Sequence, residues 1–348
     1  MKINKVEKSR IKEVDFDNLV FGQTLSDHMF VMDYTNGQWG EPSIEPFGGM
    51  SFFPSIASLH YGQTIFEGLK AYKNENGSVL LFKPDTHEIR INNSASRLCM
   101  PELPAGTMSS ALKALLDIDR DWVPTQPGQS LYIRPLMFAT EQTLGVHPSH
   151  SYRFVIFTSP VASYYSGAVK VKVEREYVRA AEGGTGFIKS GGNYAASLLP
   201  TQNAINEGYN QVLWTDSKEH KYIEEIGTMN VFFQIGDNIV TPELTSSILP
   251  GITRQSVIDL AKKWGLVVEE RKVTVTEVLE AQQNGQLKDA FGSGTAATIT
   301  QISTIGDKGV DYVLDPSLPR EFSTRAQSYL NKLKVGQEED YMSWMVTI

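Results

Sequence analysis

The segment Gly186-Phe187-Ile188-Lys189-Ser190-Gly191-Gly192-Asn193-Tyr194-Ala195-Ala196-Ser197 is the part of the chain from which both fold and chemistry can be argued. One lysine lies there among glycines and small residues, with an Asn-Tyr pair four and five positions later. Glycines allow a bulky ligand to approach the backbone closely. A lysine kept short of solvent has its ammonium form disfavoured and can act as a nucleophile. The segment therefore predicts a reactive lysine at position 189.

A second motif, Glu224-Glu225-Ile226-Gly227-Thr228-Met229-Asn230, follows downstream. Together the two motifs resemble the pyridoxal 5′-phosphate (PLP) site of the branched-chain amino acid aminotransferases, and the resemblance extends from about Phe21 to Trp344-Met345-Val346. It implies the two-domain fold of type IV PLP enzymes, of α+β or α/β class. It also implies transamination of leucine, isoleucine and valine with 2-oxoglutarate, which gives branched 2-oxo acids and L-glutamate.

The resemblance assigns roles around the PLP ring. Lys189 matches the lysine that forms the Schiff base and later moves a proton between Cα and C4′, and Tyr194 matches the tyrosine that bonds the ring hydroxyl. Glu225 matches the glutamate that faces the pyridine nitrogen, where a carboxylate raises the pKa of that nitrogen. Without the resemblance, Lys189 would be a solvated surface lysine, Tyr194 a core residue, and Glu224 with Glu225 a solvated pair.

Three parts of the chain are candidates for the phosphate. Leu249-Pro250-Gly251-Ile252-Thr253-Arg254-Gln255 opens an expected helix, and backbone N–H groups at a helix N-terminus bind anions, so Ile252 and Thr253 would donate there. An ordinary Pro-Gly turn fits the same motif. By resemblance, Arg90 and Thr295 are further phosphate ligands, and the amides of Thr295 and Ala296 face the substrate carboxylate. Otherwise Arg90 would be an exposed helical arginine.

The substrate pocket is expected from the resemblance too. Aromatic side chains suit a branched aliphatic group, and an arginine at their edge could take the distal carboxylate of glutamate. The matching residues are Tyr61, Phe66, Tyr132 and Arg134 of the smaller domain, with Thr228 from the second motif. Taken singly, such aromatics are more often core residues. In the family part of this pocket comes from the partner subunit, which implies a homodimer or a dimer-based oligomer.

The order of motifs predicts two domains. A smaller N-terminal α/β domain is expected over 1–158, a linker over 159–168, and a larger PLP-binding domain over 169–348. Helices are expected from Thr86 to Leu98 and from Thr253 to Trp264. Strands are expected at 30–34, 65–72, 78–82, 130–136, 152–158, 169–173, 210–215 and 230–235, with 65–72 at a sheet edge and hairpin turns at Asn36-Gly37 and Asn76-Gly77.

Composition narrows the class of protein. The 348 residues carry a formal charge of −8, which argues against a nucleic-acid partner. No apolar run approaches the roughly 18 residues of a membrane span, and no apolar segment follows the N-terminal residues 1–8, so neither a membrane anchor nor a secretory signal is expected. Cys99 is the only cysteine, which fits a reducing cytoplasm. Mammalian relatives have a Cys-x-x-Cys pair where Ala297 and Thr300 stand, so thiol control is not expected.

Other interpretations are weaker. Gly292-Ser293-Gly294-Thr295-Ala296-Ala297 fits a dinucleotide-binding turn, but no βαβ unit surrounds it. Lys189-Ser190 lacks the glycine that precedes the lysine in a phosphate-binding loop. His147 and His150 are separated by Pro148 in a loop, and no metal site is expected. D-amino-acid aminotransferases and aminodeoxychorismate lyases share the implied fold and lysine but are typically shorter. A PLP carrier without turnover stays open, although Glu225 favours chemistry.

Overall fold

The computed structural model describes residues 1–162 and 167–348. Contacts between Cα atoms divide the chain into two compact units. Unit 1 consists of Met1–Tyr164, Ile188–Gly191 and Lys332–Ile348, and unit 2 of Tyr165–Phe187 and Gly192–Asn331. No helix of the described residues is long and apolar enough to cross a membrane.

Unit 1 is built on a ten-stranded sheet with the order β1-β4-β2-β9-β8-β6-β7-β19, to which β3 is added on β2 and β5 on β8. All of its pairings are antiparallel except that of β1 with β4. Both ends of the chain contribute strands to this sheet. The strands are β1 (Lys2–Ile3), β2 (His28–Thr35), β3 (Gln38–Trp39), β4 (Ser43–Pro46), β5 (Thr64–Phe66), β6 (Leu69–Lys73), β7 (Val79–Phe82), β8 (Ser130–Ala139), β9 (Tyr152–Val161) and β19 (Met345–Thr347).

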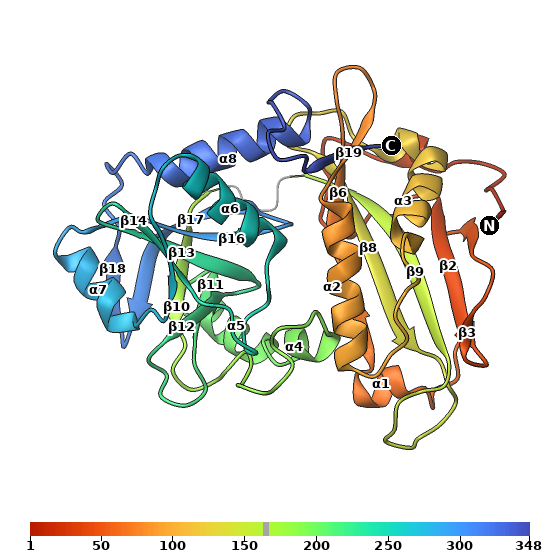
Figure 1. Ribbon diagram of the computed structural model, residues 1–348, viewed down its shortest axis with the longest axis horizontal. Coiled ribbons are helices and arrows are strands. Elements are labelled where there is room, and N and C mark those ends of the chain that lie inside the picture. Colours follow the sequence, from red (N-terminus) through yellow and green to blue (C-terminus); the bar gives the residue numbers. More distant parts are fainter. Residues whose placement is uncertain (163–166) are drawn as a thin grey trace. The chain divides into compact units, whose positions relative to one another are not determined.

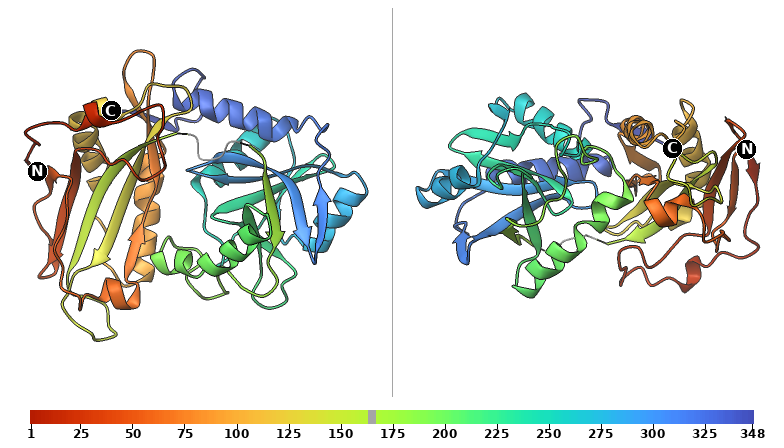
Figure 2. Two further views of the ribbon diagram at one scale, coloured as in Figure 1. Left: turned by 180° about the vertical axis from the view of Figure 1, so that it is seen from behind. Right: turned by 90° about the horizontal axis from the view of Figure 1, so that it is seen from below.

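Helices α2 (Pro84–Arg97) and α3 (Thr107–Ile118) pack on one face of the unit 1 sheet, and Figure 1 shows them beside β8, β9 and β2. Seen from behind, the strands lie in front of α2 (Figure 2). The helices contribute Ile91, Ala95 and Leu112 to a core that also contains Phe30 and Phe154 from the sheet. Because these side chains recur at helical spacing in α2 and α3, the apolar faces turn toward the sheet. A short helix, α1 (Ala57–Tyr61), precedes β5.

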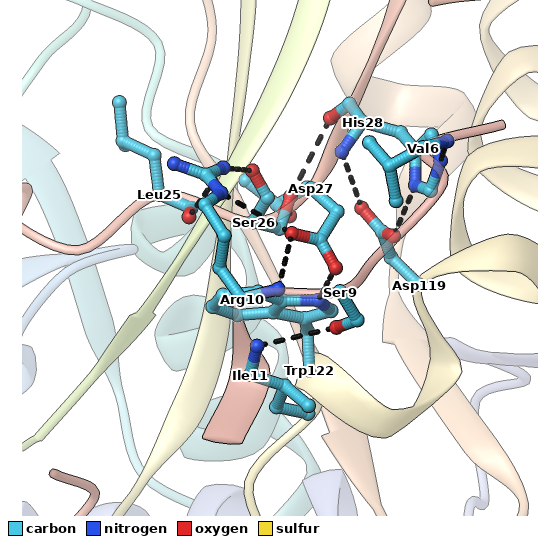
Figure 3. Close-up of polar contacts among 11 residues, drawn as sticks. Val6, Ser9, Arg10, Ile11, Leu25, Ser26, Asp27, His28, Asp119 and Trp122 are labelled. Carbon is cyan, nitrogen blue, oxygen red and sulfur yellow. Dashed lines mark hydrogen bonds and ion pairs between the residues drawn. The ribbon is translucent and has the colours of Figure 1, made fainter. Parts of the chain in front are cut away.

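The N-terminal segment is fixed to the unit 1 sheet by a polar network around β2 (Figure 3). Asp27 accepts bonds from the Arg10 backbone N–H at 3.1 Å and from Trp122 Nε1 at 3.0 Å. His28 Nε2 accepts from the Val6 N–H at 3.0 Å, so its Nδ1 carries the proton and donates to Asp119 at 2.6 Å. Since Asp27, His28 and Asp119 are buried, these bonds satisfy groups that would otherwise destabilise the fold.

Unit 2 contains a nine-stranded sheet with the order β12-β11-β10-β17-β16-β13-β14-β15, and β18 pairs with β17. An additional pairing of β12 with β13 closes part of this sheet into a ring. The parallel pairs are β10–β11, β10–β17 and β14–β15. The strands are β10 (Val169–Val173), β11 (Gln211–Thr215), β12 (Ile223–Ile226), β13 (Met229–Ile235), β14 (Asn238–Pro242), β15 (Val268–Arg271), β16 (Leu287–Gly294), β17 (Thr298–Asp307) and β18 (Val310–Val313).

The helices of unit 2 contact different strands of its sheet (Figure 1). Helix α5 (Leu198–Asn206) contacts β11, α6 (Ile252–Lys263) contacts β16, and α7 (Val275–Gln283) contacts β13, β16 and β18. Helix α6 buries Val257, Leu260 and Ala261 on one side. The remaining helices are α4 (Gly191–Ala195) and α8 (Glu321–Lys334), each of which has residues in both units.

The α+β class and both sequence-derived helices are confirmed, and each expected strand has a counterpart. The hairpin at Asn36-Gly37 is confirmed, because Thr35 pairs with Gln38 and both turn residues have positive φ. The edge position expected for 65–72 holds only for its first part: the segment divides at Glu67-Gly68, and among the described residues β5 pairs with no strand other than β8. For the second part it is wrong, because β6 lies inside the sheet between β7 and β8. The proposed linker overlaps the end of β9, and its residues 163–166 lie outside the described residues, so the domain bounds stay a prediction.

Candidate active site

Lys189 is held in unit 1 by backbone bonds on both sides of its peptide. Its N–H donates to Ser94 Oγ of α2 at 3.1 Å, and its carbonyl accepts from the N–H of Phe66 at 3.0 Å. The neighbouring Ser190 forms an antiparallel bridge with Ile65. The segment therefore lies alongside β5, and the half-buried Lys189 projects from a backbone fixed at several points.

Phe66, Tyr132 and Arg134, three of the four pocket residues expected from the smaller domain, lie close to Lys189, with the Phe66 ring at the centre. Lys189 Nζ lies 4.7 Å from the centre of the Phe66 ring, and Arg134 Cζ also lies 4.7 Å from it. Arg134 Nη2 donates to the hydroxyl of Tyr132 at 3.0 Å. Both cations face the electron-rich ring, an arrangement favourable by about 0.5–1 kcal/mol or more for each cation. The reactive lysine and the aromatic-arginine pocket thus form one cluster within unit 1.

A hollow of about 460 Å³, counted to its open mouth, lies beside this cluster. Arg134 Nε and Ser159 Oγ are buried there without a hydrogen-bond partner among the described residues. Such buried donors favour an acceptor that arrives with a ligand. The lining residues are Phe21, Gly22, Leu25, Tyr132, Arg134, Phe157 and Ser159.

Tyr61 lies apart from this cluster. Its hydroxyl donates to the carbonyl of Leu144 at 2.5 Å, in the loop between β8 and β9. Tyr61 is 45% exposed, and Leu144 is 62% exposed. Neither this hydrogen bond nor the ring contact of Tyr61 with His60 involves Phe66, Tyr132 or Arg134, so its role in the pocket stays a prediction.

Arg90 is a buried residue of α2 and is engaged by a carboxylate that sequence reasoning missed. Its Nε donates to Glu67 Oε1 at 2.6 Å, and its Nη2 donates to Glu67 Oε2 at 2.9 Å. His87 Nδ1 also bonds Glu67 Oε2, at 2.6 Å. Sequence reasoning without the resemblance expected an exposed helical arginine, and this is wrong because α2 turns Arg90 toward the gap between β5 and β6.

The charges around Glu67 can be assigned from burial. Burial alone would raise the pKa of Glu67, but the Arg90 guanidinium and the bonds from Arg90 and His87 hold this pKa far below its ordinary value. Burial, with smaller effects from the charges of Arg90 and Lys189, lowers the pKa of His87 below its ordinary value although Glu67 acts to raise it. His87 is therefore neutral at neutral pH and donates through Nδ1–H, whereas Arg90 supplies the positive charge that balances Glu67.

Glu225 of unit 2 lies on β12, where its side chain is buried. Its Oε1 accepts from the backbone N–H of Leu249 at 2.6 Å and lies 3.2 Å from Nη2 of Arg179. Arg179 also donates to the carbonyls of Gly186 and Ser247, at 2.9 and 2.5 Å. The guanidinium of Arg179 therefore lies directly beside the carboxylate of Glu225. Arg179 was missed in the sequence, where nothing marks it as a partner of a residue 46 positions away.

Tyr194 and Thr228 line the same small hollow of unit 2 as Glu225 and Arg179. Thr228 is exposed in the two-residue turn that joins β12 to β13, where Ile226 pairs with Met229. The first turn residue, Gly227, has φ 52°, as in type II′ hairpin turns. This turn places Thr228 three positions after Glu225, and both residues line the hollow.

Glu224 is not a solvated partner of Glu225. The two side chains alternate along β12, and Glu224 is buried with a bond from Ser247 Oγ. Burial raises the pKa of Glu224, against the lowering effects of Ser247 and Arg179. Its Oε2 has no hydrogen-bond partner among the described residues. The solvated-pair interpretation is therefore wrong.

The expected phosphate residues of unit 2 lie at a helix start and at a tight turn. Ile252 and Thr253 begin α6, whose N-cap, Gly251, provides no side-chain cap to the leading N–H groups. A Cβ on Gly251 would lie 1.9 Å from Asn230 Oδ1, so the close packing of this start requires glycine. Thr295 and Ala296 form the turn between β16 and β17. Since β17 is a strand, the dinucleotide interpretation of 292–297 is excluded by the absence of the required helix.

These residues fit PLP by the chemistry of their donors. An uncapped helix start is an anion site, and α6 provides one. The buried hydroxyl of Ser293, beside the 295–297 turn, has no partner within the described residues. Unit 2 also provides a buried carboxylate and a tyrosine, and unit 1 separately provides a half-buried lysine, which are the residue types that the cofactor needs.

Comparison with known proteins defines the class. The family described as "Amino-transferase class IV" matches residues 64–305, and the chain belongs to it. A relative from Staphylococcus epidermidis (strain ATCC 12228 / FDA PCI 1200), named "Probable branched-chain-amino-acid aminotransferase", is 46% identical over 353 residues, covering 100% of this chain and 98% of its own. "Branched-chain-amino-acid aminotransferase 2" from Bacillus subtilis (strain 168) is 46% identical over 338 residues, covering 96% and 93%.

Solved structures agree with this class. The branched-chain amino acid aminotransferase of Escherichia coli has a TM-score of 0.75 and 27% identity, over 92% of this chain and 98% of that one. The T.th. branched-chain amino acid aminotransferase with pyridoxamine 5′-phosphate has a TM-score of 0.75 and 25% identity, over 90% and 97%. The resemblance stated from the sequence is confirmed, and PLP is the cofactor of this class IV aminotransferase.

Proposed function

We propose that this chain transfers the amino group of leucine, isoleucine and valine to 2-oxoglutarate, producing branched 2-oxo acids and L-glutamate. The observation that carries the proposal is the cluster of Lys189, Arg134 and Tyr132 around Phe66. It combines an amine for catalysis, aromatic surface for an aliphatic side chain, and a cation for a second carboxylate. The names of the relatives support the same substrates.

Lys189 is the proposed catalytic base, because its fixed backbone keeps the amine near the aromatic surface. PLP, when bound, withdraws electrons from the substrate Cα and so acidifies its proton. With PLP bound, Lys189 would take that proton from Cα and return it at C4′. Glu225 would keep the pyridine nitrogen protonated, and Tyr194 would hold the ring hydroxyl. Arg179 positions Glu225 by pairing with its Oε1.

The proposed phosphate ligands are Arg90, Ile252, Thr253 and Thr295. The uncapped start of α6 supports the roles of Ile252 and Thr253, because its first N–H groups are free to donate and form the positive end of the helix dipole. Arg90 presents a guanidinium whose Nε edge is fixed by Glu67. The amides of Thr295 and Ala296, with Thr228, are proposed for the substrate carboxylate.

Specificity is proposed to come from one pocket that accepts two kinds of side chain. Phe66 and Tyr132 provide apolar surface for a branched aliphatic group, and Arg134 pairs with the distal carboxylate of glutamate. The unpartnered buried Nε of Arg134 supports this role, since a carboxylate would complete its hydrogen bonds.

We propose that the enzyme is a homodimer in which Tyr61 serves the pocket of the partner. The exposed apolar surface around Tyr61 supports this, because Leu144 and Val146 of the adjoining loop are 62% and 84% exposed. Adjoining exposed apolar side chains favour burial in an interface.

The enzyme is proposed to work in the cytoplasm. A single cysteine, Cys99, is consistent with that reducing compartment.

The function is tested by mixing the PLP form with one amino acid at a time in a stopped-flow spectrometer. Leucine, isoleucine, valine and glutamate should each convert the cofactor to its amine form in a single turnover, and D-leucine should not. Conversion by D-amino acids alone would overturn the proposed substrates. Cofactor binding without conversion by any amino acid would mean a PLP carrier instead of an enzyme.

A further inference from the structure

The loop between β8 and β9 brings together a glutamate and two histidines that the aminotransferase site does not use. Glu141, His147 and His150 each offer one ligand atom, and these atoms all lie within 4.8 Å of one another. All three belong to unit 1, and both histidines are exposed. The sequence did not reveal this set, because a turn of the loop brings Glu141 back to His150.

Glu141 and His150 already have the spacing of two ligands on one ion. His150 Nδ1 lies 3.1 Å from each carboxylate oxygen of Glu141. Two ligand atoms bound tetrahedrally at about 2.0–2.1 Å lie roughly 3.3 Å apart. The backbone N–H of His150 donates to Glu141 Oε2 at 2.6 Å and so fixes the carboxylate. Such a bond to a ligating carboxylate is a regular feature of metal sites.

His147 is oriented to offer its other ring nitrogen. Its Nδ1 lies 2.9 Å from the carbonyl of Pro148, which accepts the Nδ1–H proton and leaves Nε2 unprotonated. Metal-binding histidines are commonly held this way by a backbone carbonyl. Gly145 packs against the Nε2 edge of the His147 ring, where a Cβ would lie 2.8 Å from Nε2. The His147 and His150 ring centres are 5.6 Å apart, so a small rotation of an exposed side chain completes the triad.

The other histidines have different surroundings. His28 pairs with Asp119, His87 with Glu67, and His220 with Thr215. His60 is exposed, and its Nε2 lies 2.6 Å from the carbonyl of Pro54. Two of the three exposed histidines of the chain therefore lie in this one loop. An ordinary ion pair would account for Glu141 and His150, whereas His147, held by the carbonyl of Pro148, adds a third ligand atom to the group.

We propose that Glu141, His147 and His150 bind one divalent transition-metal ion, with Zn²⁺ the best fit, and that water fills the fourth position. Imidazole and carboxylate donors suit Zn²⁺, whereas Mg²⁺ prefers oxygen ligands in an octahedron. The ion would join the two ends of the 141–150 loop. It would thereby restrain the exposed side chains of Leu144 and Val146. The proposal does not depend on the substrate of the enzyme.

Calorimetric titration of tag-free PLP-loaded enzyme with ZnCl₂ tests the site. One Zn²⁺ per chain is expected, with no comparable binding of Mg²⁺. His147→Gln and His150→Gln should each weaken Zn²⁺ binding about 10- to 100-fold or more, the range found when even indirect support of a ligand is lost. His60→Gln is the matched control, because it removes another exposed histidine and should leave the affinity unchanged.

Anomalous diffraction at the zinc edge provides the second readout, since it locates the ion directly. A peak between Glu141, His147 and His150 supports the proposal. Equal weakening by His60→Gln, unchanged affinity in the His147→Gln/His150→Gln double variant, or a peak elsewhere in the chain would each overturn it. Unchanged cofactor absorbance and thermal unfolding of the variants show that the loss is local.

Discussion

Glu67 forms a bidentate ion pair with Arg90, with Nε–Oε1 and Nη2–Oε2 distances of 2.6 and 2.9 Å. Glu67 is fully buried, and Arg90 is only 7% exposed. A bidentate pair of this kind fixes the plane of the guanidinium as well as its position. The pair therefore presents Arg90 to an anion in one orientation, which a lone arginine on α2 could not maintain.

Removing the carboxylate should destabilise unit 1. Glu67→Ala leaves the Arg90 charge buried without its partner, and such losses cost about 3–5 kcal/mol. We expect a lower free energy of unfolding in urea and weaker PLP binding. Glu67→Gln keeps the size of the side chain but not its charge, so its free energy of unfolding should lie between those of the wild type and Glu67→Ala. Wild-type stability of Glu67→Ala would show that Arg90 finds another partner.

Arg90→Ala is expected to weaken cofactor binding and also to destabilise unit 1, because the buried Glu67 carboxylate loses its cation. Arg90→Ala removes a charge-assisted bond of about 1.5–3 kcal/mol, which corresponds to roughly ten- to a hundredfold weaker PLP binding. Arg97→Ala is the matched control, because Arg97 is an exposed arginine on the same helix. Affinity is measured by fluorescence after removal of PLP. Equal affinities of the two variants would place the phosphate away from Arg90.

Lys189 should be the residue that carries the cofactor. Borohydride reduction followed by peptide mapping is expected to place the pyridoxyl group on Lys189. Lys189→Ala should retain PLP through its phosphate ligands but lose transamination almost completely. A pyridoxyl group on a different lysine would refute the assignment. As a control, Lys189→Ala should keep the wild-type thermal unfolding profile.

Local patterns allowed much of the fold to be anticipated, and long-range pairings were the part that they missed. Val257, Leu260 and Ala261 recur at helical spacing, and the helix they predict is α6. The partnership of Glu67 with Arg90 joins a strand end to a helix across 23 positions. No periodicity encodes such a pairing, because it depends on which faces meet after folding.

The site shows the same division. Lys189 could be singled out because glycines and an Asn-Tyr pair surround it in sequence. Arg179 has no such setting, and only the fold brings it to Glu225. Because side chains alternate along β12, Glu224 and Glu225 point to opposite faces of the strand, yet both are buried. Adjacent glutamates in a sequence do not reveal whether both of their environments are buried.

Glu224 should lower stability as the pH rises. Burial raises its pKa above the ordinary value of 4.5, so the folded chain holds this proton more tightly than the unfolded chain does. The resulting stabilisation is complete below pH 4.5 and is lost as the pH rises through the raised value. Glu224→Gln cannot titrate, and its melting temperature relative to wild type should therefore increase with pH.

Melting temperatures measured between acidic and neutral pH test this expectation. Glu219→Gln is the control, because Glu219 is exposed in the nearby turn. Its difference from wild type should stay nearly constant across the series. A Glu224→Gln difference that is flat or falls with rising pH would mean that Glu224 is charged and stabilised in the fold.

Arg134 is expected to separate the two half-reactions. A buried carboxylate without a paired cation is costly, whereas a branched aliphatic side chain needs no charge. Arg134→Gln should therefore slow the glutamate and 2-oxoglutarate half-reaction much more than the leucine half-reaction. Tyr132→Phe is a useful companion, because it removes the hydroxyl that receives Arg134 Nη2 and leaves the guanidinium in place. Single-turnover rates are required, since steady-state rates combine both halves. Equal losses for leucine and glutamate in Arg134→Gln would mean that Arg134 supports the pocket structurally and that the distal carboxylate binds elsewhere.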